Sequence, residues 1–296
     1  MLYFPTMELW LIFALISLVA AGLQAFTQKI GAVRRYNSSL LNGYSAGFAS
    51  ILGFTVASIY EGFTEISWLI ILVAFLSGIL SLLSSNFRMD SLRYIDTTIS
   101  LPIHKFISPL FVLIIGIILF NESLNTYEWL GIIAGMFVPL LLINKSENLR
   151  QTNLQKGIIL ITISGLLSAV AFAMNKEGTE LFTSVILYVA IVQGFVAIIG
   201  AILYKNRKPN KLHADIRIYD PKLLKLVLFG GVIQFISFAS AMLALTFGGA
   251  LAIVYTIQSL YIIIPIILSV IFFSEHWNAK KVFVIGLSIL AIVLMQ

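Results

Sequence analysis

Ten long apolar runs, separated by polar breaks, make up most of the chain. Each run holds about 20 residues, the length that an α-helix needs to cross the hydrocarbon core of a bilayer. We therefore predict an all-α membrane protein with ten transmembrane helices near residues 9–27, 39–60, 67–87, 97–120, 127–143, 157–175, 182–204, 223–246, 250–273 and 279–295.

The polar breaks between these runs are mostly short. Residues 121–126 separate the fourth and fifth runs, and Gly248-Gly249 separates the eighth and ninth, so both pairs should form tight antiparallel hairpins. Residues 205–222 form the one substantial loop, which has too few apolar residues to fold as a domain. The connections therefore add no separate soluble domain to the bundle.

Basic residues are divided unequally between the two sides of this predicted bundle. Seventeen of the 19 Lys and Arg residues lie in the breaks after the first, third, fifth, seventh and ninth runs, whereas Lys176 lies on the opposite side and Lys105 inside a run. Basic loops usually face the cytoplasm. We therefore expect an integral protein of a prokaryotic inner (plasma) membrane, with these five loops in the cytoplasm and both termini outside it.

Composition excludes the soluble classes. The chain is 59% hydrophobic and 11% charged, with a mean hydropathy of +1.00, against roughly half apolar and a quarter charged in soluble domains. The net charge of +6 is scattered over loops rather than gathered on one face, which argues against a nucleic-acid partner. Without cysteine the chain has no disulfides, thiol catalysis or thiolate metal sites.

The two halves of the chain resemble each other. The string AAGLQAFTQK ends the first run and SAVAFAMNK ends the sixth, and the strings FNE and FSE end at Glu122 and Glu275. Each half, residues 1–150 and 151–296, would hold five helices, and an odd number forces two copies into opposite orientations across the membrane. The sequence thus predicts two inverted five-helix repeats, an architecture typical of transporters.

The same strings resemble the EamA-like family of the drug/metabolite transporter superfamily over nearly the whole chain. Its features are a first helix rich in small residues that ends in a basic residue, and a proline-bearing fourth helix that runs into an acidic hairpin and a glycine-containing fifth helix. These correspond here to SPLFVLIIGIILFNESLNTYEWLGIIAG and IIIPIILSVIFFSEHWNAKKVFVIG. The resemblance implies a ten-helix carrier of metabolites, often an exporter, with its cavity among helices one, three, four, six, eight and nine. It also implies termini inside, so the orientation stays open.

Lys105 is the strongest candidate for a substrate contact. It lies about nine residues into the fourth run, roughly 13 Å along the helix axis, where a charge that has neither a partner nor water costs several kcal/mol. We expect it to face a cavity and attract a carboxylate or phosphate, although pairing with a carboxylate at a helix end remains the alternative. His104 is a weaker candidate for substrate or proton binding, because adjacent helical residues point about 100° apart.

Other polar residues inside the runs are candidate contacts as well, or else hydrogen bonds between helices. Prolines remove a backbone donor, so Pro102, Pro109 and Pro265 are expected to break or kink helices and to free carbonyls for a cavity. The carboxylates lie near the ends of the runs, so none is expected inside the membrane to pair with a cationic solute. The polar residues inside the runs therefore favour a zwitterion or an anion as the solute. The candidate substrate contacts besides Lys105 and His104 are Gln258, Tyr255, Gln234, Gln24 and Asn86.

Three other functional classes compete with a carrier as explanations of this sequence. GYSAG at 43–47 fits the G-x-S-x-G pattern of serine hydrolases, but Ser45 lies in a continuous apolar run rather than at a strand-to-helix turn. A channel or a membrane receptor is less favoured, because an inverted repeat is typical of carriers that work by alternating access. With no nucleotide or zinc motif, we expect no enzyme, cofactor or metal, and a carrier driven by a gradient, of protons for example, or by exchange. The oligomeric state is open.

Overall fold

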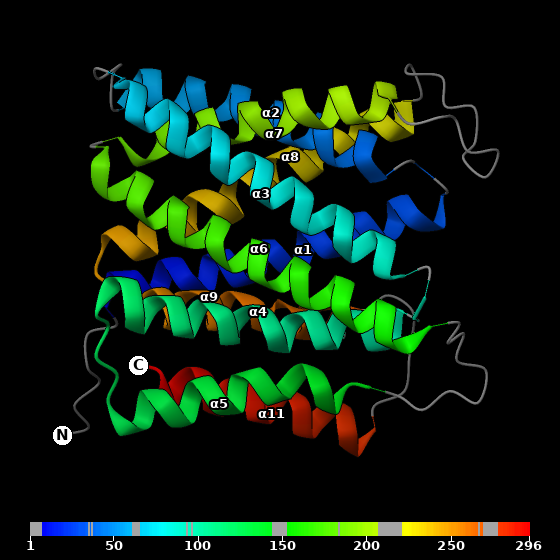
Figure 1. The fold of residues 1–296 in the computed structure, drawn as a ribbon, viewed down its shortest axis with the longest axis vertical. Coiled ribbons are helices and arrows are strands. Elements are labelled where there is room, and N and C mark those ends of the chain that lie inside the picture. Colours follow the sequence, from blue (N-terminus) through cyan, green and yellow to red (C-terminus); the bar gives the residue numbers. More distant parts are fainter. Residues whose placement is uncertain are drawn as a thin grey trace.

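The helices of the computed structural model lie side by side and run across the molecule between two opposite ends (Figure 1). The structure describes residues 8–34, 36, 38–60, 66–92, 94–95, 97–143, 153–182, 184–206, 221–265, 267–268 and 278–296. Within these ranges the regular structure is helical, in α1 Leu9–Val33, α2 Ser38–Tyr60, α3 Trp68–Ser91, α4 Thr97–Phe120, α5 Thr126–Leu141, α6 Leu154–Leu181, α7 Val185–Asn206, α8 Pro221–Thr246, α9 Leu251–Ser259, the 3-10 turn η1 Leu260–Ile262, and α11 Ala279–Leu294.

Seven of these helices, α1 to α4 and α6 to α8, are long and apolar enough to cross a membrane. Thr126–Leu141 and Leu251–Pro265 are shorter apolar helices. A helix rises 1.5 Å per residue, so a helix of 16 residues covers about 24 Å and falls short of the roughly 30 Å hydrocarbon core. The protein is therefore an all-helical integral membrane protein, and a count of ten spans stays a prediction.

Both predicted hairpins are present. Asn121 ends α4 in the left-handed region, with φ 50°, and α5 then begins with a capping box. In that box Asn125 Oδ1 accepts from the Glu128 backbone N–H at 2.9 Å, while the Glu128 carboxylate accepts from the Asn125 N–H at 2.6 Å. Between α8 and α9, Gly248 adopts φ 95°, which a residue with a Cβ rarely tolerates.

The three prolines differ in their effect on the helices. The ninth predicted span is interrupted, since α9 ends at Ser259 and η1 follows it. Pro265 cannot donate to the carbonyl one turn earlier, at Tyr261, and this favours the tighter turn there. At Pro102 and Pro109 α4 is not broken, because it continues through both residues, and a kink there stays a prediction. Each proline removes only one backbone donor, so the rest of the helix can keep its hydrogen bonds.

Helices of the two halves interleave instead of forming separate bodies. The main helix pairs are α1 with α8, α3 with α6, and α2 with α7, and α5 packs on α11. Exchanging the halves turns the α1–α8 pair into α6–α3 and leaves α2–α7 unchanged. Figure 1 also shows α1 and α6 crossing the bundle in opposite directions. This arrangement has the symmetry expected of inverted repeats.

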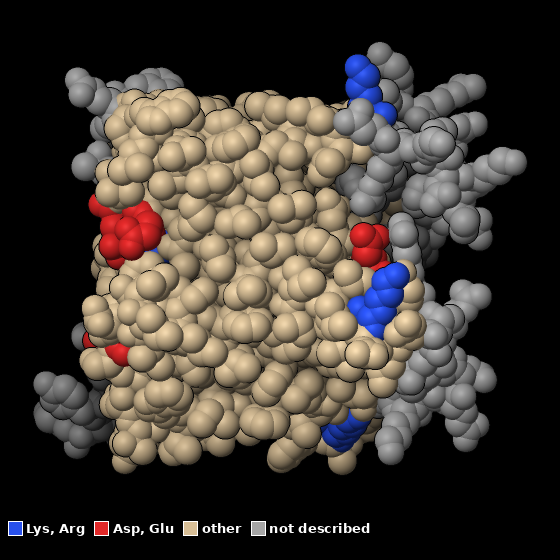
Figure 2. Space-filling view, viewed as in Figure 1, with Lys and Arg blue, Asp and Glu red and all other residues tan. Residues whose placement is uncertain are grey.

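The two ends of the bundle differ in charge. In Figure 2 the visible Lys and Arg side chains of the described residues gather at the right-hand end. The start of α1 and the end of α11 lie at the left-hand end (Figure 1). We call these the basic end and the terminus end below.

Candidate substrate cavity

A cavity of about 340 Å³ lies among the helices of both halves. The helices α1, α3, α6, α7, α8 and α9 supply most of its wall, and α2 and α4 add Asn42 and Lys105. Six of the seven predicted contacts line it: Lys105, Gln258, Tyr255, Gln234, Gln24 and Asn86. Pro102, Pro109 and Pro265 are not among its lining residues.

The cavity occupies the half of the bundle toward the basic end. Helices α1 and α3 both start at the terminus end (Figure 1). Their lining residues fall in their second halves, over residues 21–28 and 81–89. In α7, which also starts at the terminus end, lining residues continue as far as Leu203. The first turns of these three helices contribute nothing to the wall, so the cavity stops short of the terminus end.

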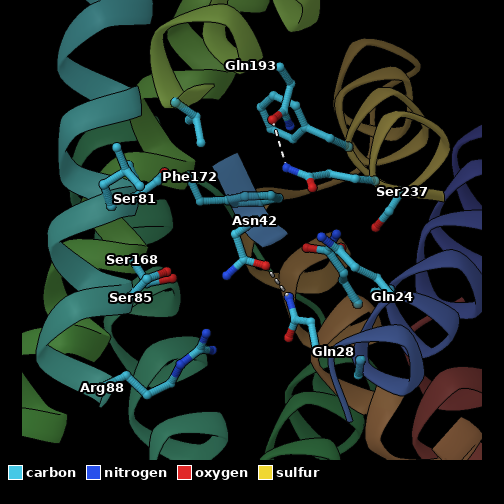
Figure 3. A pocket seen from close by; sticks show the side chains of 18 of the residues that line it. Gln24, Gln28, Asn42, Ser81, Ser85, Arg88, Ser168, Phe172, Gln193 and Ser237 are labelled. Carbon is cyan, nitrogen blue, oxygen red and sulfur yellow. Dashed lines mark hydrogen bonds between the residues drawn. The ribbon is translucent and has the colours of Figure 1, made fainter. Parts of the chain in front are cut away.

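Amide side chains face one another across the cavity (Figure 3). Gln234 of α8 donates from Nε2 to Gln193 Oε1 of α7 at 2.9 Å. Toward the basic end Gln28 of α1 donates to Asn42 Oδ1 of α2 at 3.3 Å. Each amide in such a pair keeps further donors and acceptors, so these walls can also bind a polar ligand.

Hydroxyl groups occupy the middle of the cavity. The Tyr255 hydroxyl of α9 lies 2.9 Å from Ser168 Oγ of α6, and the Tyr255 ring meets Phe172 edge to face, with centroids 4.7 Å apart. Gln258 donates to Ser17 Oγ of α1 at 2.8 Å. The hydrogen bonds of Tyr255 and Gln258 therefore tie α9 to α6 and α1, helices from both halves.

Two cations line the same cavity. Lys105 Nζ lies 4.3 Å from the centroid of the Tyr261 ring of η1. Arg88 points from α3 into the cavity (Figure 3). Arg88 is not among the contacts predicted from the sequence. The signal that could have found it is the spacing Ser81, Ser85, Arg88, which places three polar side chains on one face of α3.

The terminus end is closed by buried polar contacts. Glu122, directly after α4, pairs with Lys176 Nζ of α6 at 2.9 Å, and their side chains are 8% and 13% exposed. The same carboxylate accepts from the N–H groups of Leu251 at 2.5 Å and Ala252 at 3.3 Å. Glu122 thus caps the start of α9, while Asn125 caps α5, the helix that directly follows Glu122 in sequence.

Comparison with known proteins identifies the family. The model of the EamA-like transporter family matches residues 8–144 and again residues 155–296. The chain belongs to the EamA-like transporter family. The junction predicted after residue 150 lies between the two matched ranges. No curated protein matches this EamA-like transporter.

The EamA-like transporter shares its fold with solved structures. One, described only as a crystal structure of a protein, aligns with a TM-score of 0.76 at 14% sequence identity, over 96% of this chain and 95% of the other. An identity this low shows the fold alone. The helix arrangement is therefore one that an experimental structure has also revealed.

His104 does not face the cavity of this EamA-like transporter, which corrects the expectation that placed it with the substrate contacts. Its side chain is 3% exposed, and its Nε2 lies 3.4 Å from Ser108 Oγ, one turn along α4. Its Nδ1 has no hydrogen-bond partner among the described residues. The reason is helix geometry, because Lys105 takes the cavity side and its neighbour points about 100° away.

The hydrolase alternative gains no support from the geometry. Ser45 is 5% exposed inside α2, and its Oγ lies 3.5 Å from the Val227 carbonyl oxygen of α8. His104 contacts Ser108 instead. Among the described residues there is also no group of three or more His, Cys, Asp or Glu that could hold a metal ion.

Proposed function

We propose that this EamA-like transporter is a secondary carrier that moves a small polar metabolite, a zwitterion or an organic anion, by alternating access. The observation that supports this most is the polar cavity between the two halves, which is lined toward the basic end and stops short of the terminus end. An amide-lined and hydroxyl-lined cavity of about 340 Å³ suits a small polar solute.

The inverted repeats explain how the protein can reach a second conformation, in which the cavity opens at the terminus end. When two halves have the same fold in opposite orientations, each can adopt the conformation of the other, and the cavity then opens at the opposite end. In this proposal the terminus end opens when the contacts of Glu122 with Lys176 and with the start of α9 separate. The 3-10 turn η1 beside Lys105 provides a flexible point at which α9 can reorient.

The charge distribution suggests the direction of transport. Basic loops favour the cytoplasmic side, so we infer that the basic end faces the cytoplasm. In this conformation the solute would then enter the cavity from the cytoplasm. Export across a prokaryotic inner membrane follows naturally from such a state. Energy would come from exchange or from a coupled gradient, of protons for example, without a bound cofactor.

Counterflow in proteoliposomes tests the proposal. Purified protein is reconstituted with unlabelled 4-aminobutanoate or succinate inside, and uptake of the same labelled compound is followed, with Tyr255→Ala as the impaired variant. A carrier gives saturable uptake that trapped unlabelled solute accelerates. Uptake that rises linearly with concentration and ignores the trapped solute indicates a channel, and failure of both compounds to cross contradicts the proposed substrate range.

A further inference from the structure

Arg88 and Lys105 share one cavity, and no carboxylate among the described residues lies close enough to neutralise either of them. Both side chains are half-buried, and both line the cavity. Within the described part of the chain, neither has an Asp or Glu at ion-pair distance, whereas Lys176 has Glu122. The Lys105 ammonium instead rests on the Tyr261 ring.

Two unneutralised cations inside a membrane protein are costly. Charged residues within membrane-spanning segments normally pair with one another or with backbone carbonyls, or they mark the path of a substrate. A cation–π contact offsets only part of the free energy lost when an ammonium group leaves water. The pair of positive charges therefore calls for a negative counterpart that enters the cavity.

The rest of the wall does not supply that counterpart. The other polar lining groups are amides and hydroxyls such as Gln24, Asn42, Gln193 and Ser85, and no Asp or Glu of the described chain is among the lining residues. A positively charged solute would meet repulsion and no acid to bind it. A zwitterion would leave its ammonium without a carboxylate partner.

We propose that Arg88 and Lys105 form an oxyanion subsite, and that the transported solute is an organic anion with a carboxylate or phosphate group and no ammonium group. This inference rests on the proposed carrier function and narrows its substrate class. The guanidinium of Arg88 presents a planar fork that matches two oxygens, and Lys105 adds a point charge. The amide pairs and the Ser168–Tyr255 hydroxyls then hold the polar remainder.

A series of four-carbon compounds of similar size separates the effect of charge on binding from the effect of size. Binding to the purified full-length protein is measured calorimetrically with succinate, 4-aminobutanoate, succinamide and 1,4-diaminobutane; glycerol 3-phosphate beside glycerol tests phosphate. We expect at least one of the two oxyanion probes to bind at least about 10-fold more tightly than its matched uncharged compound, and the diamine not to bind. The better of succinate and glycerol 3-phosphate identifies the preferred oxyanion.

Variants assign the binding to the two cations. Arg88→Gln and Lys105→Gln should each weaken the oxyanion probe by about 10-fold or more, the size of a lost charge-assisted hydrogen bond of about 1.4 kcal/mol or more. Lys225→Gln, an exposed basic residue on α8 outside the cavity wall, is the matched control and should change little. Arg88→Lys keeps the charge, loses the fork and should recover part of the affinity, which distinguishes a lost contact from a misfolded protein.

The inference is overturned if neither oxyanion probe binds more tightly than its uncharged analogue, or if both Gln variants bind it like the wild type. Counterflow distinguishes this failure from failure of the carrier itself. If 4-aminobutanoate shows saturable counterflow that Arg88→Gln and Lys105→Gln leave intact, the protein is a carrier and the oxyanion subsite is wrong. If no probe shows counterflow, the carrier function fails first.

Discussion

Two lysines inside the helical bundle, Lys176 and Lys105, each lie over an aromatic ring but differ in whether a carboxylate pairs with them. At the terminus end, Lys176 pairs with Glu122, which also caps α9, and little of either side chain reaches solvent. In the cavity, Lys105 lies over an aromatic ring with no carboxylate at ion-pair distance among the described residues. A buried cation with its own acid belongs to the architecture, whereas one without an acid marks a place for a ligand.

Two glycines, one near the terminus end and one beside the cavity, differ in how closely the neighbouring helices pack around them. Near the terminus end, a Cβ on Gly178 of α6 would lie 2.2 Å from the ring of Tyr188, the same tyrosine that donates to Asn175 at 3.0 Å. Beside the cavity, a Cβ on Gly200 of α7 would lie at an ordinary 3.5 Å from the Gly43 Cα. The helices therefore pack much more closely around Gly178 than around Gly200.

The largest expected effect is the loss of the Glu122 charge. Glu122→Gln should lower the free energy of unfolding by about 3–5 kcal/mol, because it leaves the Lys176 ammonium buried without a partner. Reversible unfolding of the purified protein in mixed micelles measures it.

Glu128→Gln is the matched control for this change. Glu128 also accepts a backbone N–H at a helix start, on the same hairpin, but no basic residue is seen to pair with it in the described structure. Its replacement should cost about 1 kcal/mol or less. Equal losses for the two variants would show that the Lys176 pair contributes nothing.

Packing gives the next largest effect. Gly178→Ala should destabilise the protein by about 1–3 kcal/mol, since the added methyl group displaces the Tyr188 ring. Gly200→Ala should be neutral or stabilise by up to about 1 kcal/mol, because alanine favours a helix and the site has room. Unfolding of the two variants side by side checks this, and a Gly200→Ala loss as large as that of Gly178→Ala would refute the packing difference.

The smallest effect on stability is expected in the cavity itself. Lys105→Gln removes a charge without leaving an orphaned acid, so the free energy of unfolding without ligand should not fall by more than about 1 kcal/mol. The same unfolding assay measures it, with Glu122→Gln as the comparison. A loss as large as that of Glu122→Gln would mean that Lys105 has a structural partner.

Local patterns predicted much of this molecule. Apolar runs located the helices, and the charge of Lys105 inside a run was enough to place it in the cavity wall. Contacts between distant segments were out of reach, since sequence alone brings neither Arg88 and Lys105 to one cavity nor Glu122 to the start of α9. The break in the ninth span depends on a single missing donor at Pro265, and the same chemistry at Pro102 and Pro109 left α4 continuous.

Access to the middle of the cavity from both sides of the membrane tests alternating access most directly. The chain has no cysteine, so Ser168→Cys, a nearly isosteric change in the cavity wall, gives a single reactive thiol. Membrane-impermeant maleimide is applied to vesicles of each orientation, with and without transported solute. The account predicts labelling from the basic end at rest and from both ends, in alternation, during transport. Labelling from the basic end alone under transporting conditions would contradict it.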